Sequence, residues 1–216
     1  MPNDASLLLD DADPAAILVE SLAMFERACL ASSLGPQSLV ILDLLTGMGR
    51  SLPVLFLDTG EHFPETLSFL ERVERRYGIA ITRVVPESPV AGQWSTDPDA
   101  CCANRKVEPL RRALRPFQAW ITGIRRDQTA NRAAARAVDW DLQFGLWKVN
   151  PMVRWSRTQV DAYLHRHDVP SHPLLAEGYT SIGCRPCTGP ADDERAGRWA
   201  GSAKTECGLH LTPRRS

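Results

Sequence analysis

The order of apolar segments along the chain predicts an α/β fold, in which helices flank a mostly parallel sheet. A short apolar run at residues 53–57 stops at a polar turn, and the next helix opens at Pro64 with its apolar side chains on one face. A second apolar run, residues 79–85, comes directly after that helix. Strands and helices that alternate in this way are typical of parallel sheets.

The sequence before this unit predicts a helix, a strand and one ambiguous segment. Residues 15–30 have the pattern of an amphipathic helix that runs into a short strand near residues 28–32. A turn comes next, and then the apolar run 39–45. That run fits a buried strand or a buried helix equally well, because periodicity does not separate the two.

The sequence after residue 63 predicts three helices and two further strands. The helix that opens at Pro64 is ended by Gly78, which leads into the strand at residues 79–85. Another helix is expected at residues 103–114, followed by a strand at residues 119–122. Residues 156–159, Ser-Arg-Thr-Gln, form a capping box that starts the last predicted helix.

The sequence changes character after Gly183. It becomes rich in Gly, Pro, Arg and Lys and loses its apolar periodicity, which predicts an irregular segment and a mobile tail rather than more core. We therefore divide the chain into an α/β domain, residues 1–190, and a C-terminal segment, residues 191–216.

The carboxyl ends of the predicted strands are the expected place for a ligand. In open parallel sheets, ligands bind in the crevice at this edge. Three loops fall there, at residues 32–35, 58–60 and 123–126.

Charge and composition argue against two classes of function. The net charge of the 216 residues is −1, which argues against broad nucleic-acid binding because that binding relies on a dominant cationic field. The first residues are acidic and have no basic stretch before an apolar run, so no secretory signal is expected. No apolar run approaches the ~20 residues that span a membrane. We expect a cytoplasmic protein with no membrane or nucleic-acid partner.

The cysteines carry the clearest chemical signal. Four of the six form two pairs, Cys101 with Cys102 and Cys184 with Cys187, and 81 residues separate the pairs. Two thiolate pairs from distant segments suit zinc or an iron–sulfur cluster. Adjacent cysteines are an awkward chelate for one tetrahedral zinc ion, whereas a four-iron cluster offers each thiolate its own iron. The spacing therefore favours a cluster, with structural zinc and a redox dithiol as alternatives.

A single cysteine near the C-terminus is a candidate nucleophile. Cys207 is flanked by Lys204 and His210, which favour a thiolate, and is followed by a glycine that leaves it accessible. Arg195 and Arg198 are three residues apart, so on one helical turn they would face the same way and hold an anion. On spacing alone, these arginines fit a solvated surface equally well.

Several stretches together resemble one known family, the assimilatory reductases of adenylylated sulfate. That family contains adenosine 5′-phosphosulfate (APS) reductases and 3′-phospho-APS (PAPS) reductases. The resemblance covers about residues 28 to 210. The matching stretches are Leu57–Gly60, His62–Thr66, Lys106–Pro109, Thr122–Gln128, His172–Leu174, Gly178–Tyr179, Gly197–Trp199 and Glu206–His210.

The resemblance implies a fold and a reaction. The fold is the adenine-nucleotide alpha-hydrolase-like (PP-loop, HUP-type) fold. The two cysteine pairs resemble those of the APS reductases, which hold a [4Fe–4S] cluster, whereas typical PAPS reductases lack them. The implied reaction is the thioredoxin-dependent reduction of APS to sulfite and AMP in assimilatory sulfate reduction. Cys207 would attack the substrate sulfur and carry an S-sulfocysteine intermediate, which thioredoxin or a glutaredoxin-like protein reduces.

The resemblance also implies roles for other residues. Arg195 and Arg198 would hold the phosphosulfate group, and Lys106 would place positive charge between the cluster and the sulfate. The expected nucleotide contacts are Ser33, Gly35, Leu57, Thr59, Gly123, Arg125 and Arg126. Gly35 and Gly123 fit a role in shaping turns equally well, and Arg125 and Arg126 fit pairing with carboxylates such as Asp127.

Three other functions compete with APS reduction. A PAPS reductase would use the same cysteine and would need room and cations for a 3′-phosphate. An ATP-pyrophosphatase-type ligase of the same fold would need a Ser-Gly-Gly-x-Asp-Ser phosphate loop, which residues 32–38 do not supply, and no Walker A sequence is present. A zinc or iron–sulfur regulator would leave residues 206–210 without a purpose. A homo-oligomer is compatible with the sequence.

Overall fold

The computed structural model describes residues 9–210, and its centre is one six-stranded sheet. The strand order is β3-β2-β1-β4-β6-β5. All neighbouring strands are parallel except the edge pair β5 and β6, which is antiparallel. The predicted α/β class with a mostly parallel sheet is therefore confirmed. The strands are β1 Ala28–Ala31, β2 Val54–Leu57, β3 Ile81–Val84, β4 Ala119–Ile121, β5 Val138–Asp141 and β6 Leu146–Val149.

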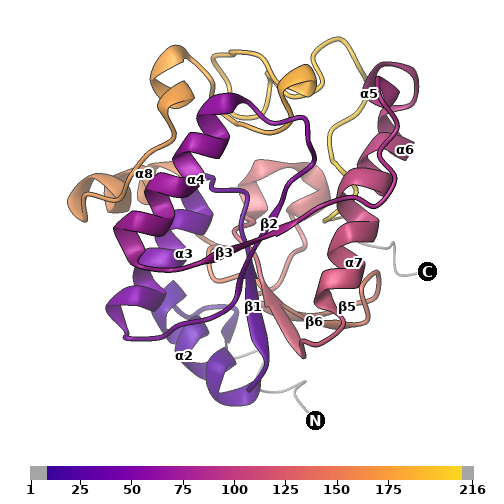
Figure 1. The fold of residues 1–216 in the computed structure, drawn as a ribbon. Helices are drawn as coiled ribbons and strands as arrows, with labels where there is room; N and C mark the ends of the chain where they lie inside the picture. Colours follow the sequence, from indigo (N-terminus) through magenta and orange to yellow (C-terminus); the bar gives the residue numbers. More distant parts are fainter. Residues whose placement is uncertain (1–8, 211–216) are drawn as a thin grey trace.

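Helices cover both faces of this sheet (Figure 1). One face carries four helices, which pack with the strands into the larger core. The other face carries α7, whose leucines form a second core with β1, β4 and β6. The four helices are α2 Pro14–Met24, α3 Pro36–Gly47, α4 Pro64–Tyr77 and α8 Arg157–Arg166, and the helix on the other face is α7 Glu108–Leu114.

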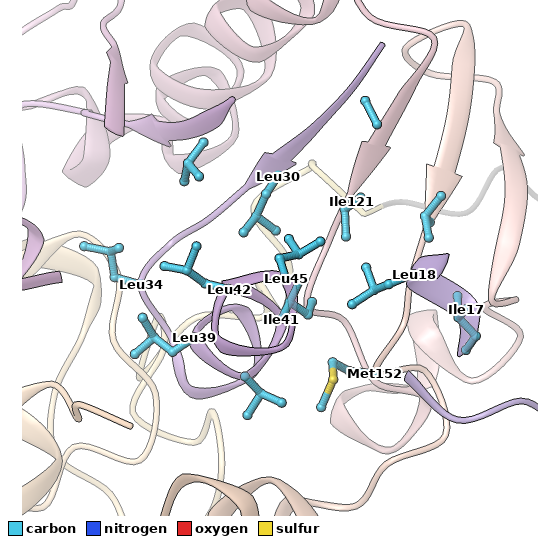
Figure 2. Close-up of a cluster of buried hydrophobic side chains, with 14 of the residues drawn as sticks. Ile17, Leu18, Leu30, Leu34, Leu39, Ile41, Leu42, Leu45, Ile121 and Met152 are labelled. Atoms are coloured by element: carbon cyan, nitrogen blue, oxygen red, sulfur yellow. The ribbon is translucent and has the colours of Figure 1, made fainter. Parts of the chain in front are cut away.

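The larger core lies between α3 and the sheet (Figure 2). Leu39, Ile41 and Leu45 of α3 are almost completely buried, as is Leu30 of β1. Burial of each such side chain contributes about 1.5–3 kcal/mol. Because α3 is tightly packed on this face, the loop that precedes it is fixed over the carboxyl end of β1.

The ambiguous run at residues 39–45 is a helix. Pro36 occupies the first turn of α3, where a residue without an N–H and with a fixed φ is well suited. The helix then continues to Gly47, packed on both the sheet and α8. A run that is buried nearly all round carries no amphipathic pattern, which explains why its sequence did not separate helix from strand.

The other predicted elements agree with the structure, with three differences. The first helix ends at Met24 rather than running into the strand. The expected helix at residues 103–114 begins with a π-helical turn, η1 Ala103–Val107. The antiparallel pair β5–β6 was not predicted, because its alternation is weak and exposed at the sheet edge. Shorter elements are α5 Gln93–Thr96, α6 Pro98–Cys102, η2 Arg126–Gln128, η3 Ala130–Arg132, η4 Pro173–Glu177 and η5 Arg185–Cys187.

The chain after residue 183 is irregular, as predicted, up to the last described residue. Apart from the 3-10 turn η5, it holds no helix, and one isolated bridge joins Thr188 to Arg198. This segment crosses the end of the molecule at which the β-strands finish and lies beside α6 (Figure 1). The mobility of the tail stays a prediction. No helix within residues 9–210 has the length and apolar character that would let it cross a membrane.

Candidate active site and cysteine cluster

A cavity opens where the direction of strand connection reverses. β1 lies between β2 and β4, so the chain moves outward on one side of β1 and then returns to its other side. In open α/β sheets this switch point is where ligands bind. The cavity has a volume of about 200 Å³. Its walls include residues after β1, β2 and β4, the first turn of α3 and the C-terminal segment.

The loop between β1 and α3 presents backbone N–H groups to this cavity. Ser32 shapes the loop, because its hydroxyl accepts from the Leu34 amide at 3.0 Å and donates to Ser38 at 2.9 Å. The N-cap of α3 is Gly35, whose lack of a side chain leaves the first-turn amides without a side-chain acceptor. Such amides and the helix dipole favour an anion.

Gly123 allows this loop to lie close to β4. A Cβ atom at residue 123 would come within 3.0 Å of the Gln37 side chain and of the Ser38 backbone nitrogen. The absence of that atom brings the end of β4 and the start of α3 together as two sides of the cavity. Gly35 and Ser33 line the cavity on the α3 side.

Glycines also fold the C-terminal segment over the cavity. A Cβ atom on Gly197 would lie 2.0 Å from the carbonyl oxygen of Gly189, and one on Gly183 would lie 2.3 Å from Arg198. The first clash is with backbone, so residue 197 needs glycine, whereas the second is with the flexible end of a side chain. The absence of a Cβ atom at residue 183 leaves room for the Arg198 guanidinium, and Arg195 and Arg198 both line the cavity.

Two cations in the cavity lack a carboxylate partner within residues 9–210. Lys106 and Arg198 form no ion pair with any described residue, and Nε of Arg198 is buried without an acceptor. Arg195, by contrast, bonds Glu206 at 3.3 Å and the Thr205 carbonyl at 2.8 Å. Unpaired buried cations are costly, so an anion bound here would be strongly favoured.

Cys207 lies in the same cavity and is electrostatically activated. Burial alone would raise the pKa of its thiol, but Lys106, the Leu209 backbone amide and Arg198 together lower it below the ordinary value. In turn, although burial opposes its charge, the sulfurs of Cys184 and Cys207 raise the pKa of Lys106. A thiol with a depressed pKa is the reactive kind of cysteine.

The four paired cysteines surround a second, much smaller cavity. Its lining includes Cys101, Cys102, Cys184 and Cys187, and its volume is about 10 Å³. Within residues 9–210, no three His, Cys, Asp or Glu side chains come close enough to hold one metal ion. Four thiols from two distant segments that line one cavity are compatible with a four-thiolate site.

Lys106 and Cys184 line both cavities and form the wall between them. On the cysteine side, the Thr59 hydroxyl lies 3.3 Å from the sulfur of Cys184. Arg105 donates to the Thr59 carbonyl at 2.6 Å and pairs with Glu61 at 3.4 Å. These contacts fix the Cys184 sulfur and the loop after β2 in one place.

The structure brings together most, but not all, of the residues expected to bind substrate. Ser33, Gly35, Leu57, Gly123, Lys106, Arg195, Arg198 and Cys207 line the active-site cavity. Thr59 instead lies beside Cys184. Arg126 donates to the Ala135 carbonyl at 2.7 Å and pairs with Asp10, away from the cavity lining.

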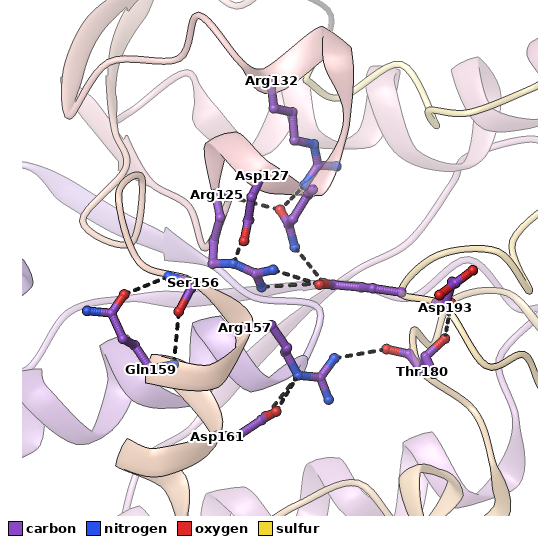
Figure 3. A network of polar contacts seen from close by, with 11 residues as sticks. Arg125, Asp127, Arg132, Ser156, Arg157, Gln159, Asp161, Thr180 and Asp193 are labelled. Carbon is purple, nitrogen blue, oxygen red and sulfur yellow. Dashed lines mark hydrogen bonds and ion pairs between the residues drawn. The ribbon is translucent and has the colours of Figure 1, made fainter.

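Arg125 does not line the active-site cavity, although its partner Glu194 does. It is fully buried and bonds Asp127 at 2.9 Å and Glu194 at 2.6 Å (Figure 3). Of the two interpretations left open by the sequence, the structure places Arg125 in the carboxylate pairing. Its contact with Glu194 ties the loop after β4 to the segment that carries Arg195 and Arg198.

Sequence reasoning missed three charged residues around the site. Arg132 lines the cavity and bonds Glu206, and Glu194 accepts from Arg125. Glu206 lies within a stretch that the resemblance includes, but its partner is 74 residues away in the chain. Nothing in one sequence indicates such a pairing between an irregular loop and an irregular tail.

These features define an α/β protein with an anion-binding cavity at the sheet switch point and an activated cysteine inside it. Residues 27–190 match the phosphoadenosine phosphosulfate reductase domain family. The match spans more than half of the chain, so the protein belongs to this family, as its motifs predicted.

The named relatives include both PAPS reductases and APS reductases. A phosphoadenosine 5′-phosphosulfate reductase from Gloeobacter violaceus is 46% identical, with 93% of this chain and 90% of that protein covered. An adenosine 5′-phosphosulfate reductase from Streptomyces coelicolor is 41% identical, over 94% of this chain and 90% of that protein. Adenosine 5′-phosphosulfate reductase 2 of Bacillus subtilis is 42% identical, with 86% and 84% covered.

Solved structures confirm the predicted fold. The PAPS reductase of Candida auris, solved as a phosphate complex, superposes with a TM-score of 0.77 at 26% identity, over 85% of this chain and 94% of that chain. The FMN adenylyltransferase of Candida glabrata superposes with a TM-score of 0.67 at 18% identity, over 82% of this chain and 63% of that chain. The latter likeness concerns the fold alone.

Proposed function

We propose that this protein reduces APS to sulfite and AMP in assimilatory sulfate reduction, with Cys207 as the nucleophile. The observation that carries the proposal is the position of Cys207. It lies in one cavity with Lys106 and Arg198, two cations that have no carboxylate partner among the described residues. A thiolate and a sulfate are both anions, so both need such cations in order to meet.

The substrate would lie across the switch point. The first-turn amides of α3, with Ser33 and Gly35, would receive the nucleotide part, with Leu57 and Gly123 beside it. Thr59 supports this wall through its contact with Cys184. Arg195 and Arg198 would hold the phosphosulfate group near the thiol.

The chemistry proceeds in two transfers. The Cys207 thiolate attacks the substrate sulfur, the bond from sulfur to the phosphate oxygen breaks, and AMP leaves with that oxygen's electron pair. This step leaves a sulfonate on the enzyme as S-sulfocysteine. A dithiol protein of the thioredoxin or glutaredoxin type then attacks the Cys207 sulfur, releases sulfite, and resolves the mixed disulfide with its second thiol. The dithiol is oxidised and Cys207 is regenerated.

Cys101, Cys102, Cys184 and Cys187 would hold a [4Fe–4S] cluster. They fit it because the fold brings all four thiols, from two distant segments, into the lining of one small cavity. When bound, the cluster would supply structural closure of the four-cysteine site. Lys106, which lies in the wall between the two cavities, would supply the positive charge between the anionic cluster and the sulfate.

The thiol assignment is tested by mass spectrometry without a reductant. Anaerobic protein mixed with APS is expected to gain the mass of one SO₃ group, and Cys207→Ser is expected to bind APS without that gain. Cys29→Ser is the matched control, because Cys29 is buried in the second core and should leave the adduct intact. Sulfite release by the Cys207→Ser variant at the wild-type rate would remove the assignment.

A PAPS reductase using the same cysteine is the second candidate, because one relative of that name is 46% identical over 93% of the chain. A competition between APS and PAPS for single-turnover sulfite release separates the two. Preference for APS by a factor of at least ten, or about 1.4 kcal/mol, would support the first candidate. The reverse preference would establish the second.

Location and assembly remain proposals. All six cysteines are free thiols, which accords with the reducing cytoplasm that we propose as the location. A homo-oligomer remains compatible with the chain.

A further inference from the structure

Two carboxylates of the C-terminal segment form ion pairs with two buried arginines of the loop after β4. Glu194 accepts from Arg125, and Glu206 accepts from Arg132. Gln128 connects the two pairs, because it donates to Glu194 and accepts from Arg132. We call these five residues the clasp. Figure 3 shows the Arg125 and Arg132 side chains of this network.

Glu206 is the most fully engaged member of the clasp. It is buried, and its two oxygens accept from Nε and Nη2 of Arg132, each at 2.8 Å. It also accepts from the Thr129 hydroxyl at 2.9 Å and from Arg195 at 3.3 Å. A two-point arginine–carboxylate pair has fixed geometry as well as strength. The carboxylate of Glu206 is thus held in one orientation.

The residue after Glu206 is the nucleophile. Residues 200–210 contain no helix or strand, so no regular backbone hydrogen bonding fixes the position of Cys207. Glu206 is the buried, multiply bonded side chain of this stretch. An anchored carboxylate one residue away restricts where the Cys207 sulfur can lie.

The same contacts divide the cavity cations into two sets. Arg132 donates from Nε and Nη2 to Glu206 and from Nη1 to Gln128, so each of its three nitrogens has a partner in the protein. Arg195 is shared between Glu206 and the cavity. Lys106 and Arg198 keep their charge for a ligand. Glu206 therefore orients two cavity arginines, Arg132 and Arg195, while it leaves the two unpaired cations untouched.

Glu206 does not activate the thiol by its charge. Its carboxylate acts to raise the pKa of Cys207, against the lowering by Lys106. A negative charge next to the nucleophile is unfavourable for thiolate formation, so the presence of Glu206 calls for another explanation. Its contacts with Arg132 and Thr129, which anchor the chain beside Cys207, supply that explanation.

We infer that Glu206 is a positioning residue, which places Cys207 and Arg195 for sulfur transfer by holding Arg132 and Thr129. The inference rests on the proposed function for the reaction that it serves. The two explanations of Glu206 predict opposite signs for the charge-neutral variant Glu206→Gln. Loss of positioning slows attack by Cys207, whereas removal of a repelling charge alone would accelerate it.

The test compares Glu206→Gln, Glu206→Asp and the exposed control Glu71→Gln. The readouts are the single-turnover rate of SO₃ adduct formation with APS, the steady-state kcat and KM, and iodoacetamide labelling of Cys207 quantified by peptide mapping. Glu206→Gln is expected to slow the adduct step about 10- to 100-fold, since a small misplacement costs rates of this size. KM should change less than kcat, and Glu206→Asp should recover part of the rate.

Thr129→Val provides a second variant that keeps the charge. Thr129 donates to Glu206 and does not line the cavity, so the change removes one anchor without touching a bound ligand. A smaller loss of adduct rate is expected, and the double variant with Glu206→Gln should be no slower than Glu206→Gln alone. Melting temperature and iron content are measured for every variant to verify folding.

The outcomes separate the inference from the proposed function. A folded Glu206→Gln variant that forms the adduct as fast as wild type, or faster, overturns the positioning role while the nucleophile assignment survives. A wild-type protein that forms no adduct defeats the proposed function. In that case, unchanged iodoacetamide labelling of Cys207 in Glu206→Gln would also overturn the positioning role, and altered labelling would support it.

Discussion

At the scale of single residues, the active-site cavity is organised by charge that the protein leaves unsatisfied. Lys106 and Arg198 have no carboxylate partner among the described residues, although Glu194 and Glu206 of the C-terminal segment pair with other arginines. The nearest compensating groups are sulfurs, because Cys184 and Cys207 act to raise the pKa of Lys106. The state of the thiol and the state of the lysine are therefore coupled.

This coupling predicts the pH dependence of thiol reactivity. The pKa of Cys207 is lowered, after burial is offset by Lys106 and neighbouring groups. The rate of Cys207 alkylation should therefore reach half its maximum below pH 9.0, the ordinary value for a thiol. Lys106→Gln should move that midpoint upward, because the cation that lowers the pKa of Cys207 is gone. Peptide mapping across a pH series measures the midpoint for wild type and for Lys106→Gln, with iron content as a control. An unmoved midpoint would show that Lys106 does not lower the pKa of Cys207.

His172 predicts an acid-dependent loss of stability. Its Nδ1 accepts from the Leu174 amide, so Nε2 carries the proton and donates to Thr66 at 2.9 Å. Burial is the main cause that lowers the pKa of His172 from 6.5 to about 4. As the pH falls, His172 binds a proton in the unfolded chain before it does so in the folded protein. The stability that neutral, buried His172 contributes is therefore complete above pH 6.5. It is lost as the pH falls towards 4, and amounts to about 3 kcal/mol.

Urea unfolding between pH 7 and pH 4 checks this contribution. His172→Gln should have a flatter dependence of unfolding free energy on pH than wild type, because the residue that titrates is gone. His165→Gln, at an exposed position of α8, should keep the wild-type dependence. Equal slopes for wild type and His172→Gln would show that other groups cause the acid sensitivity.

At the scale of elements, the π-helical turn η1 sets the geometry of the cysteine cavity. It lies between α6, which ends with Cys101 and Cys102, and α7, which packs on the sheet. A π-helical turn holds one residue more than an α-helical turn, so it rotates the helix on its N-terminal side relative to the helix on its C-terminal side. Lys106 lies inside the turn and so reaches both cavities.

Removal of one residue from η1 is expected to empty the proposed cluster site. Asn104 is exposed, and its deletion would allow a continuous α-helix while turning the tandem cysteines by about 100° relative to α7. We expect helix content to be retained and bound iron to fall by most of its amount. Iron assay and circular dichroism measure the two, and Asn104→Ala is the control that should retain iron. Full iron in the deletion variant would contradict the role of the turn.

The elements also show where sequence reasoning succeeds and where it stops. Strands β2 and β4 and helix α4 follow from apolar runs and from Gly78, because their signals are local. The four paired cysteines and Cys207 were singled out because sulfur chemistry and motif spacing mark them without a structure, and their roles stay predictions. Glu206 and Arg132 were missed as a pair, because two distant segments approach each other only through the completed fold. The contact of Arg125 with Glu194 was also missed, since one sequence does not reveal which carboxylate a buried arginine meets.

At the scale of the whole molecule, the Arg125–Glu194 pair is one of two ion pairs that join the loop after β4 to the C-terminal segment. The Arg125 side chain is 1% exposed and that of Glu194 is 24% exposed. Although burial opposes its charge, Arg125 holds the pKa of Glu194 below its ordinary value. The pair therefore persists as an ion pair at neutral pH and links residues that are 69 positions apart.

Breaking this pair should weaken the whole structure. Arg125→Met leaves Glu194 without its main partner and is expected to lower the free energy of unfolding by about 3 kcal/mol. The double variant Arg125→Met with Glu194→Met should recover a large part of that loss, because neither charge is then left alone. Chemical denaturation of Arg125→Met, Glu194→Met and the double variant measures the coupling between the two residues. Unchanged stability with a raised KM for APS would instead favour direct contact between Arg125 and the nucleotide.

The distance along the chain between the two cysteine pairs bears on how the protein is made. The 81 residues between them include β4, β6 and α8, so the four sulfurs become neighbours only when these elements are in place. Closing so long a loop in an unfolded chain is entropically unfavourable. Iron and sulfide for the proposed cluster would therefore be delivered to a finished, folded polypeptide rather than to one still leaving the ribosome. With the proposed cluster, the metal-free protein would be an obligatory stage of biosynthesis, and its lifetime in the cell would limit how much active protein accumulates.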